Sequence, residues 1–210
     1  MQSETLSGDT SLVLPEFEAP PADPLGLLRE WLDSAVLRGT REPFAAVLAT
    51  ADEAGRPSTR VLLVKEFDGR GLVFTSSSAS RKGTELAARP WASMTFYWRE
   101  TLQQLTVAGP VEVLPAELSD QYFAARPATA RAASAASAQS RTLTDEAGLH
   151  ARARYLLADA DEIRRPADWT GYRLLPESLE FWYGSPDRLH RRLRYDLANG
   201  ADWSWQRLQP

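Results

Sequence analysis

Two short segments carry residues suited to binding an anion, and each contains one of the chain's two lysines. The chain has 22 arginines and only two lysines, Lys65 and Lys82. Lysine is a compact, flexible point charge, whereas arginine is a planar fork of donors. Lys65 ends Arg60-Val-Leu-Leu-Val-Lys65, which is typical of a β-strand. Lys82 follows Ser80 and Arg81 at the expected start of a helix. The alternative to an anion site is chance placement in an arginine-biased chain.

Ser80-Arg-Lys82 has the features of a phosphate site at a helix N-terminus. Ser80 can cap the helix, and Arg81 and Lys82 then occupy its first turn, where the positive end of the helix dipole opposes cations. A phosphate bound to the exposed helix N–H groups would favour both cations there. The alternative is that both side chains extend into water. We interpret the segment as a phosphate site.

The strand segment can contribute to the same site. Alternation along residues 60–65 places Arg60 and Lys65 on opposite faces, so the two cations serve different groups. A hairpin between residues 59–67 and 71–76 would bring this strand beside Thr75 and Ser76, whose hydroxyls can donate to phosphate. We therefore expect the strand and the helix start to converge.

A third candidate segment lies near the C-terminus. Residues 180–195 combine an aromatic strand end, a Gly-Ser-Pro turn, and Arg188, His190 and Arg192 at alternate positions. On a strand those three side chains would share one face, an arrangement that grips an anionic planar ligand. Arginine-rich edge strands also serve simply to resist aggregation, and a lone histidine is usually structural. Three basic residues in register favour a binding role.

Several reaction classes lack their motifs. No Gly-x-Gly-x-x-Gly follows a strand, and there is no Walker-type phosphate loop or Gly-x-Ser-x-Gly elbow. With no cysteine and two histidines, the chain has no disulfide, no thiolate chemistry and no paired-histidine metal motif, so we expect no bound metal. Trp98 and Trp182 stand at predicted strand ends, where a flat cofactor could stack.

Length and charge limit the classes of protein to which this chain can belong. The 210 residues, 43% hydrophobic and 25% charged, suit one compact domain, which we place at residues 23–210. Residues 1–22 are expected to form an N-terminal arm that lies on the body of the protein or on a partner. The net charge of −4 argues against nucleic acid as a partner. No apolar run approaches the roughly 18 residues of a membrane span. The first 28 residues contain no Lys or Arg, so we expect no secretory leader and a cytoplasmic protein without membrane partners.

The expected elements favour a mainly β fold with helices (α+β), arranged as an antiparallel barrel rather than a doubly wound sheet. Asp23-Pro24 is typical of an N-cap with proline at the first helical position, and an apolar stripe runs from there to Gly39. Helices are also expected at residues 115–126 and 145–161, whereas residues 128–140 fit helix or loop. The predicted strands span residues 44–50, 59–67, 71–76, 91–98, 104–113, 172–175, 179–182 and 203–208.

Together these segments resemble the FMN-dependent pyridoxamine phosphate oxidases over residues 23–210. The resemblance implies a split β-barrel homodimer that holds two FMN molecules at the subunit interface. The flavin in such enzymes accepts a hydride from a small anionic heterocycle and passes electrons to dioxygen, giving hydrogen peroxide. The motifs that carry the resemblance, in family order and spacing, are Arg60-Val-Leu-Leu-Val-Lys65, Phe74-Thr-Ser before Ser80-Arg-Lys82, Trp98 through Gln104, Tyr122-Phe-x-x-Arg126-Pro, Gln139-Ser140, and Glu180-Phe-Trp182 through Arg188-Leu-His-Arg-Arg192.

The resemblance also implies roles for individual positions, with no residue assigned as a catalytic acid or base. The FMN site would be lined by Arg60, Val61, Leu62, Leu63, Val64, Lys65, Thr75, Ser76, Arg81, Lys82, Gln104, Gln139, Ser140, Trp182 and Arg192. The substrate contacts would be Lys65, Tyr122, Arg126, Arg188 and His190.

Other residues bear on the branch of the family. The arm lacks the basic and aromatic residues that pyridoxine-type members lay over the substrate, and Ala130 stands where a phosphate-binding serine is expected. In contrast, Lys65, Tyr122 and Arg126 are similar to the pyridoxine-type pattern. The segments similar to the phenazine-biosynthesis branch, whose flavin oxidases dehydrogenate reduced, carboxylated tricyclic intermediates, are Leu6-Ser-Gly, Pro15-Glu-Phe-Glu-Ala-Pro-Pro and Tyr97-Trp-Arg-Glu-Thr-Leu-Gln-Gln104.

The leading hypothesis is an FMN-dependent oxidase that dehydrogenates a reduced, carboxylated nitrogen heterocycle, a phenazine-type precursor, with dioxygen as electron acceptor. A different reduced nitrogen heterocycle is compatible with the mixed pattern. The enzyme alternative is a pyridoxamine or pyridoxine 5'-phosphate oxidase that makes pyridoxal 5'-phosphate. The last alternative is a non-catalytic flavin-binding split barrel, against which Arg188-Leu-His190 argues, because a cofactor binder alone would not need a substrate element.

Overall fold

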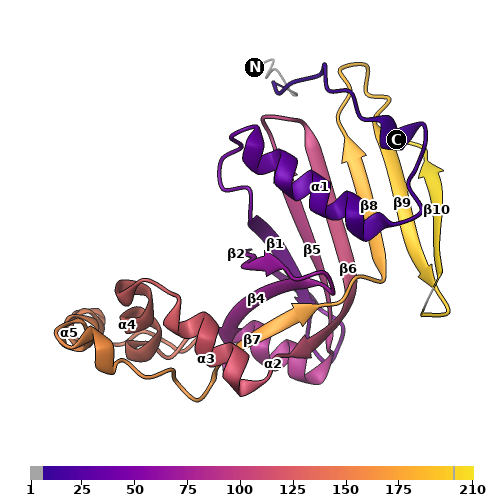
Figure 1. Cartoon of the computed structure of the whole chain (residues 1–210). Coiled ribbons are helices and arrows are strands. Elements are labelled where there is room, and N and C mark those ends of the chain that lie inside the picture. Colours follow the sequence, from indigo (N-terminus) through magenta and orange to yellow (C-terminus); the bar gives the residue numbers. More distant parts are fainter. Residues whose placement is uncertain (1–6, 201) are drawn as a thin grey trace.

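The computed structural model describes residues 7–200 and 202–210, so residues 1–6, with Leu6 and the start of the predicted arm, lie outside the described residues. In this part of the chain, ten antiparallel strands curl into a half-barrel (Figure 1). One helix lies across a face of the sheet, and others extend from one end of it. The predicted mainly β fold with helices is confirmed.

Seven strands form the continuous part of the sheet in the order β10-β9-β8-β6-β5-β1-β2. Each strand is antiparallel to its neighbours. Their bounds are β1 Ala45–Ala51, β2 Pro57–Leu63, β5 Trp91–Trp98, β6 Gln103–Val113, β8 Ser178–Tyr183, β9 Arg191–Ala198 and β10 Asp202–Leu208.

Three further strands curl this sheet. β4 (Leu72–Ser77) pairs with both β3 (Glu66–Phe67) and β7 (Trp169–Leu174). β7 in turn joins residues 111–113 of β6, whose first half pairs with β8. The long strand β6 therefore holds the two parts of the sheet together.

Helix α1 (Pro24–Leu37) lies across the sheet and covers the main core (Figure 1). Its start follows the sequence signal, because the Asp23 carboxylate accepts a hydrogen bond from the Leu25 N–H at 2.9 Å. The apolar stripe of the helix is buried, and the Trp31 ring meets Phe181 edge-on with 5.0 Å between ring centroids. The predicted helix at residues 23–39 is confirmed.

The other helices position the candidate site. α2 (Arg81–Ala88) follows β4 after a short turn, and α3 (Ala116–Ala124), α4 (Ala128–Ala136) and α5 (Glu146–Leu157) project from one end of the barrel (Figure 1). No helix among residues 7–200 and 202–210 is long and apolar enough to cross a membrane. The projecting helices share a small apolar cluster of Phe123, Ala132, Ile163 and Trp169.

The described part of the N-terminal arm, residues 7–22, lies on the body of the protein. The Asp9 N–H donates to the carbonyl of Glu100 at 2.8 Å, and the Tyr195 hydroxyl donates to the carbonyl of Pro21 at 2.9 Å. Phe17, at the end of a 3-10 turn (Pro15–Phe17), is buried in the main core. The arm is therefore anchored by backbone hydrogen bonds and by an apolar residue.

Two predicted elements are interrupted or end early in the structure, and one strand was missed. Residues 59–67 form two strands, because the chain leaves β1 after Leu63 and the Lys65 N–H then bonds to the carbonyl of Val73 on β4. The helix predicted to reach residue 161 ends at Leu157, before a 3-10 turn at Ala160–Glu162. Strand β9 was not predicted.

Trp98 does not stand ready to stack on a cofactor. The side chain is only 2% exposed, and its Nε1–H donates to the carbonyl of Pro43 at 2.9 Å. Its ring packs beside Phe96 and Trp31. The stacking role predicted for Trp98 was wrong because the end of β5 lies under α1, inside the core.

Candidate functional site

A cavity of about 570 Å³ opens where β2, β4 and α2 meet the segment that joins α4 to α5. The strand and helix segments that were expected to converge both contribute to its walls. The predicted site residues that line it are Arg60, Val61, Leu62, Thr75, Ser76, Arg81, Lys82, Arg126, Gln139 and Ser140.

The N-terminus of α2 forms one wall of this cavity. The Ser80 Oγ caps the helix by accepting a hydrogen bond from the Gly83 N–H at 3.3 Å. Gly83 is required by the close approach of the preceding turn, because a Cβ there would lie 2.4 Å from the carbonyl oxygen of Ser78. The turn and cap thus fix the direction in which the first helical residues point.

Lys82 is a buried cation in this wall. It is 8% exposed, and its Nζ donates to the Ser76 Oγ at 2.8 Å and to the Ser80 Oγ at 3.2 Å. Burial, and secondarily the charge of Arg60, lower the pKa of Lys82. No ion pair within the described ranges involves Lys82, so an anion in the cavity would supply its missing counter-charge.

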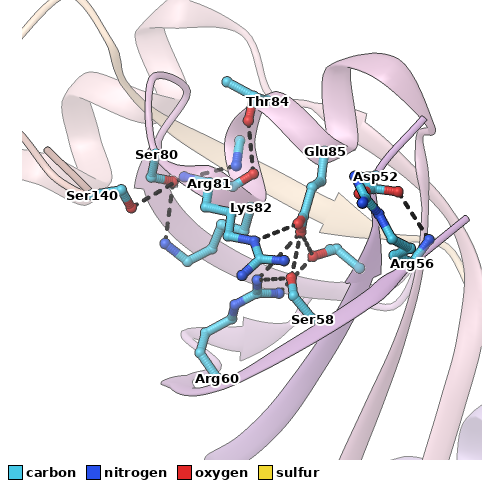
Figure 2. Close-up of polar contacts among 12 residues, drawn as sticks. Asp52, Arg56, Ser58, Arg60, Ser80, Arg81, Lys82, Thr84, Glu85 and Ser140 are labelled. Carbon is cyan, nitrogen blue, oxygen red and sulfur yellow. Dashed lines mark hydrogen bonds and ion pairs between the residues drawn. The ribbon is translucent and has the colours of Figure 1, made fainter. Parts of the chain in front are cut away.

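Glu85 joins the two arginines of the site (Figure 2). One of its oxygens accepts from the Ser58 Oγ at 2.6 Å and the Arg60 Nη2 at 3.4 Å, and the other accepts from the Arg81 Nε at 2.9 Å. Thr50 also donates to this carboxylate, at 2.5 Å. The carboxylate therefore holds both guanidinium groups beside the cavity.

The resulting charge suits a phosphate dianion. Arg60, Arg81 and Lys82 together carry three positive charges and Glu85 carries one negative charge, which leaves two positive charges facing the cavity. A phosphate monoester carries nearly two negative charges at pH 7. Sequence reasoning missed Glu85; its spacing of four residues from Arg81 on one helix face was the available signal.

The pKa of Glu85 leads to a prediction about acid stability. Desolvation raises this pKa, but hydrogen bonds from Ser58, Thr50, Arg81 and Arg60 outweigh that effect. The net result is a pKa lowered from 4.5 to about 2. A carboxylate whose pKa is lower in the folded state stabilises the fold at pH values above its unfolded-state pKa. That stabilisation is lost as the pH falls through the folded-state pKa. We expect the free energy of unfolding of the wild-type protein to fall between about pH 4.5 and about pH 2 by more than that of Glu85→Gln. Urea titrations at several pH values test this; parallel pH profiles would contradict it.

The segment between α4 and α5 folds back onto α2. The Ser140 Oγ accepts a hydrogen bond from the Arg81 N–H at 3.1 Å. The Gln139 Oε1 accepts from the Ser76 Oγ and the Ser77 N–H, both at 3.4 Å. These contacts bring residues some sixty positions apart in sequence to one wall of the cavity.

The predicted substrate residues near α3 lie beside this cavity. The Arg126 guanidinium lines it, lies 5.3 Å from the ring centroid of Trp169, and has its pKa lowered by burial. Lys65 lies in a shallower hollow formed by β2 and residues 42–44, together with Leu63 and Val64. The pKa of Lys65 is lowered by burial and then by the charge of Arg126.

Tyr122 lies outside both hollows. Its hydroxyl donates a hydrogen bond to the carboxylate of Glu66. Burial, and then this carboxylate, raise the pKa of Tyr122 to about 12. The phenol therefore remains protonated across the physiological range.

Three predicted FMN residues form a separate row on neighbouring strands. Gln104 on β6 is paired with Trp182 on β8, and Trp182 is paired with Arg192 on β9. The Arg192 Nε donates to Glu180 at 2.8 Å. β2 and β8 are four places apart in the sheet, roughly 19 Å at about 4.8 Å per strand. Within one chain, this row does not line the cavity that contains Arg60.

Arg188 and His190 do not share a strand face with Arg192, so that prediction was wrong. β9 begins at Arg191, and Arg188 has a left-handed backbone with a φ of 68°. The Ser185 N–H donates to the His190 Nδ1 at 3.0 Å, which places the proton of the neutral imidazole on Nε2. The His190 ring also lies 4.8 Å from that of Trp182. The turn, rather than strand alternation, brings His190 to the row.

Comparison with known proteins identifies a family whose models cover most of the chain. Residues 32–158 match the family described as pyridoxamine 5'-phosphate oxidase, and residues 169–210 match the pyridoxine 5'-phosphate oxidase C-terminal dimerisation region. A crystal structure of PhzG from Burkholderia lata in complex with tetrahydrophenazine-1-carboxylic acid has a TM-score of 0.93 and 44% identity, over 97% of this chain and 100% of that one.

Curated relatives carry two different names. The chain is 44% identical over 207 residues to the dihydrophenazinedicarboxylate synthase of Burkholderia lata, covering 99% of this chain and 97% of that protein. It is 48% identical over 206 residues to the pyridoxine/pyridoxamine 5'-phosphate oxidase of Ectopseudomonas mendocina, covering 94% and 93%. Overall identity does not separate these two named activities, but both relatives share one family. The chain belongs to the pyridoxamine 5'-phosphate oxidase family.

Proposed function

We propose that the protein is a homodimeric FMN oxidase that dehydrogenates a reduced, carboxylated nitrogen heterocycle of the phenazine type. The observation that carries this proposal is a single cavity that holds a phosphate-type cation cluster together with the partly buried Arg126. The substrate would lose two electrons and two protons, and dioxygen would take them up to give hydrogen peroxide. When bound, FMN would supply the two-electron acceptor that dioxygen reoxidises.

The donor set of the cavity fits the phosphate of FMN. Lys82, Arg81 and Arg60 supply cations, and Thr75, Ser76 and Ser140 supply hydroxyls. Lys82 is buried with hydroxyl partners only among the described residues, which a bound phosphate would complement. These residues would bind and orient the cofactor, and Glu85 would hold the two arginines in place.

A second copy of the chain would complete this site. The exposed side chains of Val47, Val61, Leu63 and Tyr97 share one face of the sheet, because Val47 is paired with Val61 and Tyr97 continues that face on β5. Val61 is 67% exposed. Tyr97 is also paired with Gln104, so this apolar face is continuous with the row on β6, β8 and β9.

Dimerisation through that face would bring the row of one protomer toward the cavity of the other. The dimerisation region matched by residues 169–210 includes β8, β9 and β10 and supports this arrangement. Gln104, Trp182 and Arg192 would then contact the FMN held by the partner. His190, with its proton on Nε2, would donate a hydrogen bond toward the substrate.

The phenazine-type substrate is supported by the relatives that align with almost the whole chain. The match to the PhzG structure covers 97% of this chain and therefore extends over most of the described arm, residues 7–22, which is packed on the body. Arg126 offers a guanidinium fork that suits a carboxylate. An oxidase for pyridoxamine 5'-phosphate is the second candidate, because the chain keeps Lys65 beside Arg126 and reaches 48% identity with a relative of that name.

Oxygen consumption tests the proposed function. The FMN-loaded protein should consume dioxygen and release an equal amount of hydrogen peroxide when given tetrahydrophenazine-1-carboxylic acid. It should consume little with pyridoxamine 5'-phosphate. Rapid oxygen uptake with pyridoxamine 5'-phosphate alone would instead establish the second candidate, and bound flavin without turnover of either compound would favour a non-catalytic barrel.

Arg188→Ala should separate substrate contact from cofactor binding. We expect the variant to keep FMN, because Arg188 belongs neither to the cation cluster nor to the row of Gln104, Trp182 and Arg192. Its flavin should be reduced by substrate roughly 30- to 100-fold more slowly, the loss of one charged hydrogen bond. Stopped-flow absorbance under anaerobic conditions measures this rate. Leu189→Ala, in the same turn and 68% exposed, is the control. Loss of FMN with an unchanged reduction rate would contradict the assigned role.

A further inference from the structure

We propose that Ser134 holds the carboxylate of the substrate together with Arg126, an inference that rests on the proposed function. Ser134 was not among the predicted site residues. It lies on α4 and lines the same cavity as the cation cluster. Its Oγ accepts a hydrogen bond from the Arg126 Nη1 at 2.6 Å. A hydroxyl that accepts from a guanidinium keeps its own proton, which it can donate to an anion in the cavity.

Arg126 has the surroundings of an anion-binding side chain. It is half-buried, and its guanidinium lies against the face of Trp169. In residues 7–200 and 202–210, no carboxylate forms an ion pair with Arg126 or with Lys65. The two cations are close enough for the charge of Arg126 to lower the pKa of Lys65. Arg126 is thus a partly desolvated cation without a carboxylate partner among the described residues, which favours the binding of an external anion.

The position of Ser134 on α4 explains how the chain supplies a hydroxyl without a serine at residue 130. Ala130 and Ser134 are four residues apart and therefore lie on the same face of the helix. Ser134 lines the cavity, and Ala130 is not among its lining residues. The hydroxyl thus stands one helical turn further along α4 and is directed to Arg126. A planar carboxylate can accept from both the guanidinium and this hydroxyl.

Ligand pairs that differ only in the carboxylate test this inference on the FMN-loaded dimer. We would titrate phenazine-1-carboxylic acid and unsubstituted phenazine and follow the flavin absorption bands. Ser134→Ala should weaken binding of the acid about tenfold and leave binding of phenazine unchanged. Ser134→Thr should keep the preference for the acid. Thr129→Ala, which removes an exposed hydroxyl from the same helix, is the matched control.

A second comparison separates direct contact from positioning of Arg126. In an Arg126→Ala background, Ser134→Ala should still weaken binding of the acid several-fold, because the hydroxyl contacts the ligand itself. No further loss in that background would show that Ser134 acts only through Arg126, and would overturn the inference. Equal weakening of both ligands would overturn it as well. If the wild-type protein binds neither phenazine but binds pyridoxal 5'-phosphate, the proposed substrate class fails, and this inference fails with it.

Discussion

Replacing Arg81 and Lys82 together with alanine should give a folded protein that is purified without FMN. Both side chains line the cavity, and Lys82 is buried with hydroxyl partners within the described ranges. A charged hydrogen bond contributes about 1.5–3 kcal/mol, so the loss of two should weaken FMN binding by roughly 3–6 kcal/mol, or about a hundred- to ten-thousandfold. The ratio of flavin absorbance to protein absorbance after desalting measures retention directly.

The control for this variant must remove an arginine without touching the cavity. Arg56→Ala is suitable, because its side chain is 80% exposed and pairs with Asp52 at the turn between β1 and β2. It should retain the wild-type amount of FMN. Circular dichroism should show that the double variant keeps its strands and helices. A folded double variant that binds FMN with wild-type affinity would remove the phosphate site from this cavity.

Mixed dimers should recover FMN that neither parent variant can hold. Each proposed site takes Arg81 and Lys82 from one protomer and Trp182 and Arg192 from the other. The variants Arg81→Ala/Lys82→Ala and Trp182→Ala/Arg192→Ala should each have both sites damaged. A dimer with one protomer of each kind has one site with all four side chains and one site with none. Such dimers, isolated through two different affinity tags, should hold about one FMN.

This recovery would not occur if each chain formed its site alone. In that case every site in the mixed dimer would carry two missing side chains, and FMN content would equal that of the parents. The roughly 19 Å between β2 and β8 within one chain is the structural reason to expect recovery. Equal, low FMN content in the parents and in the mixed dimer would contradict a site shared between subunits.

The elements that sequence predicted well are those with strong local patterns. Helix α1 begins where Asp23-Pro24 gives a cap and a rigid first residue, and β5 spans the predicted residues 91–98 because apolar and polar side chains alternate there. The break between β2 and β3 could not be predicted, because it depends on where β4 lies in space. In β9, charge obscured the alternation of Leu193 and Tyr195 with arginines, although the alternation was present.

The candidate site shows the same division. The cap of α2 and the cations that follow it could be predicted, since Ser80, Arg81 and Lys82 are adjacent in sequence. For Glu85, only the pairing with Arg81 four residues away had a sequence signal; its contacts with Thr50 and Ser58, 35 and 27 residues away, had none. The strand face assigned to Arg188 and His190 was wrong because alternation takes no account of a left-handed residue in a turn.

The anaerobic visible spectrum of the purified protein tests the central claim most directly. The account predicts a yellow protein whose visible flavin band bleaches on addition of tetrahydrophenazine-1-carboxylic acid, persists with pyridoxamine 5'-phosphate, and returns when air is admitted. Bleaching by pyridoxamine 5'-phosphate and not by the phenazine would contradict the proposed substrate. A colourless protein that takes up no FMN would contradict the cofactor site itself.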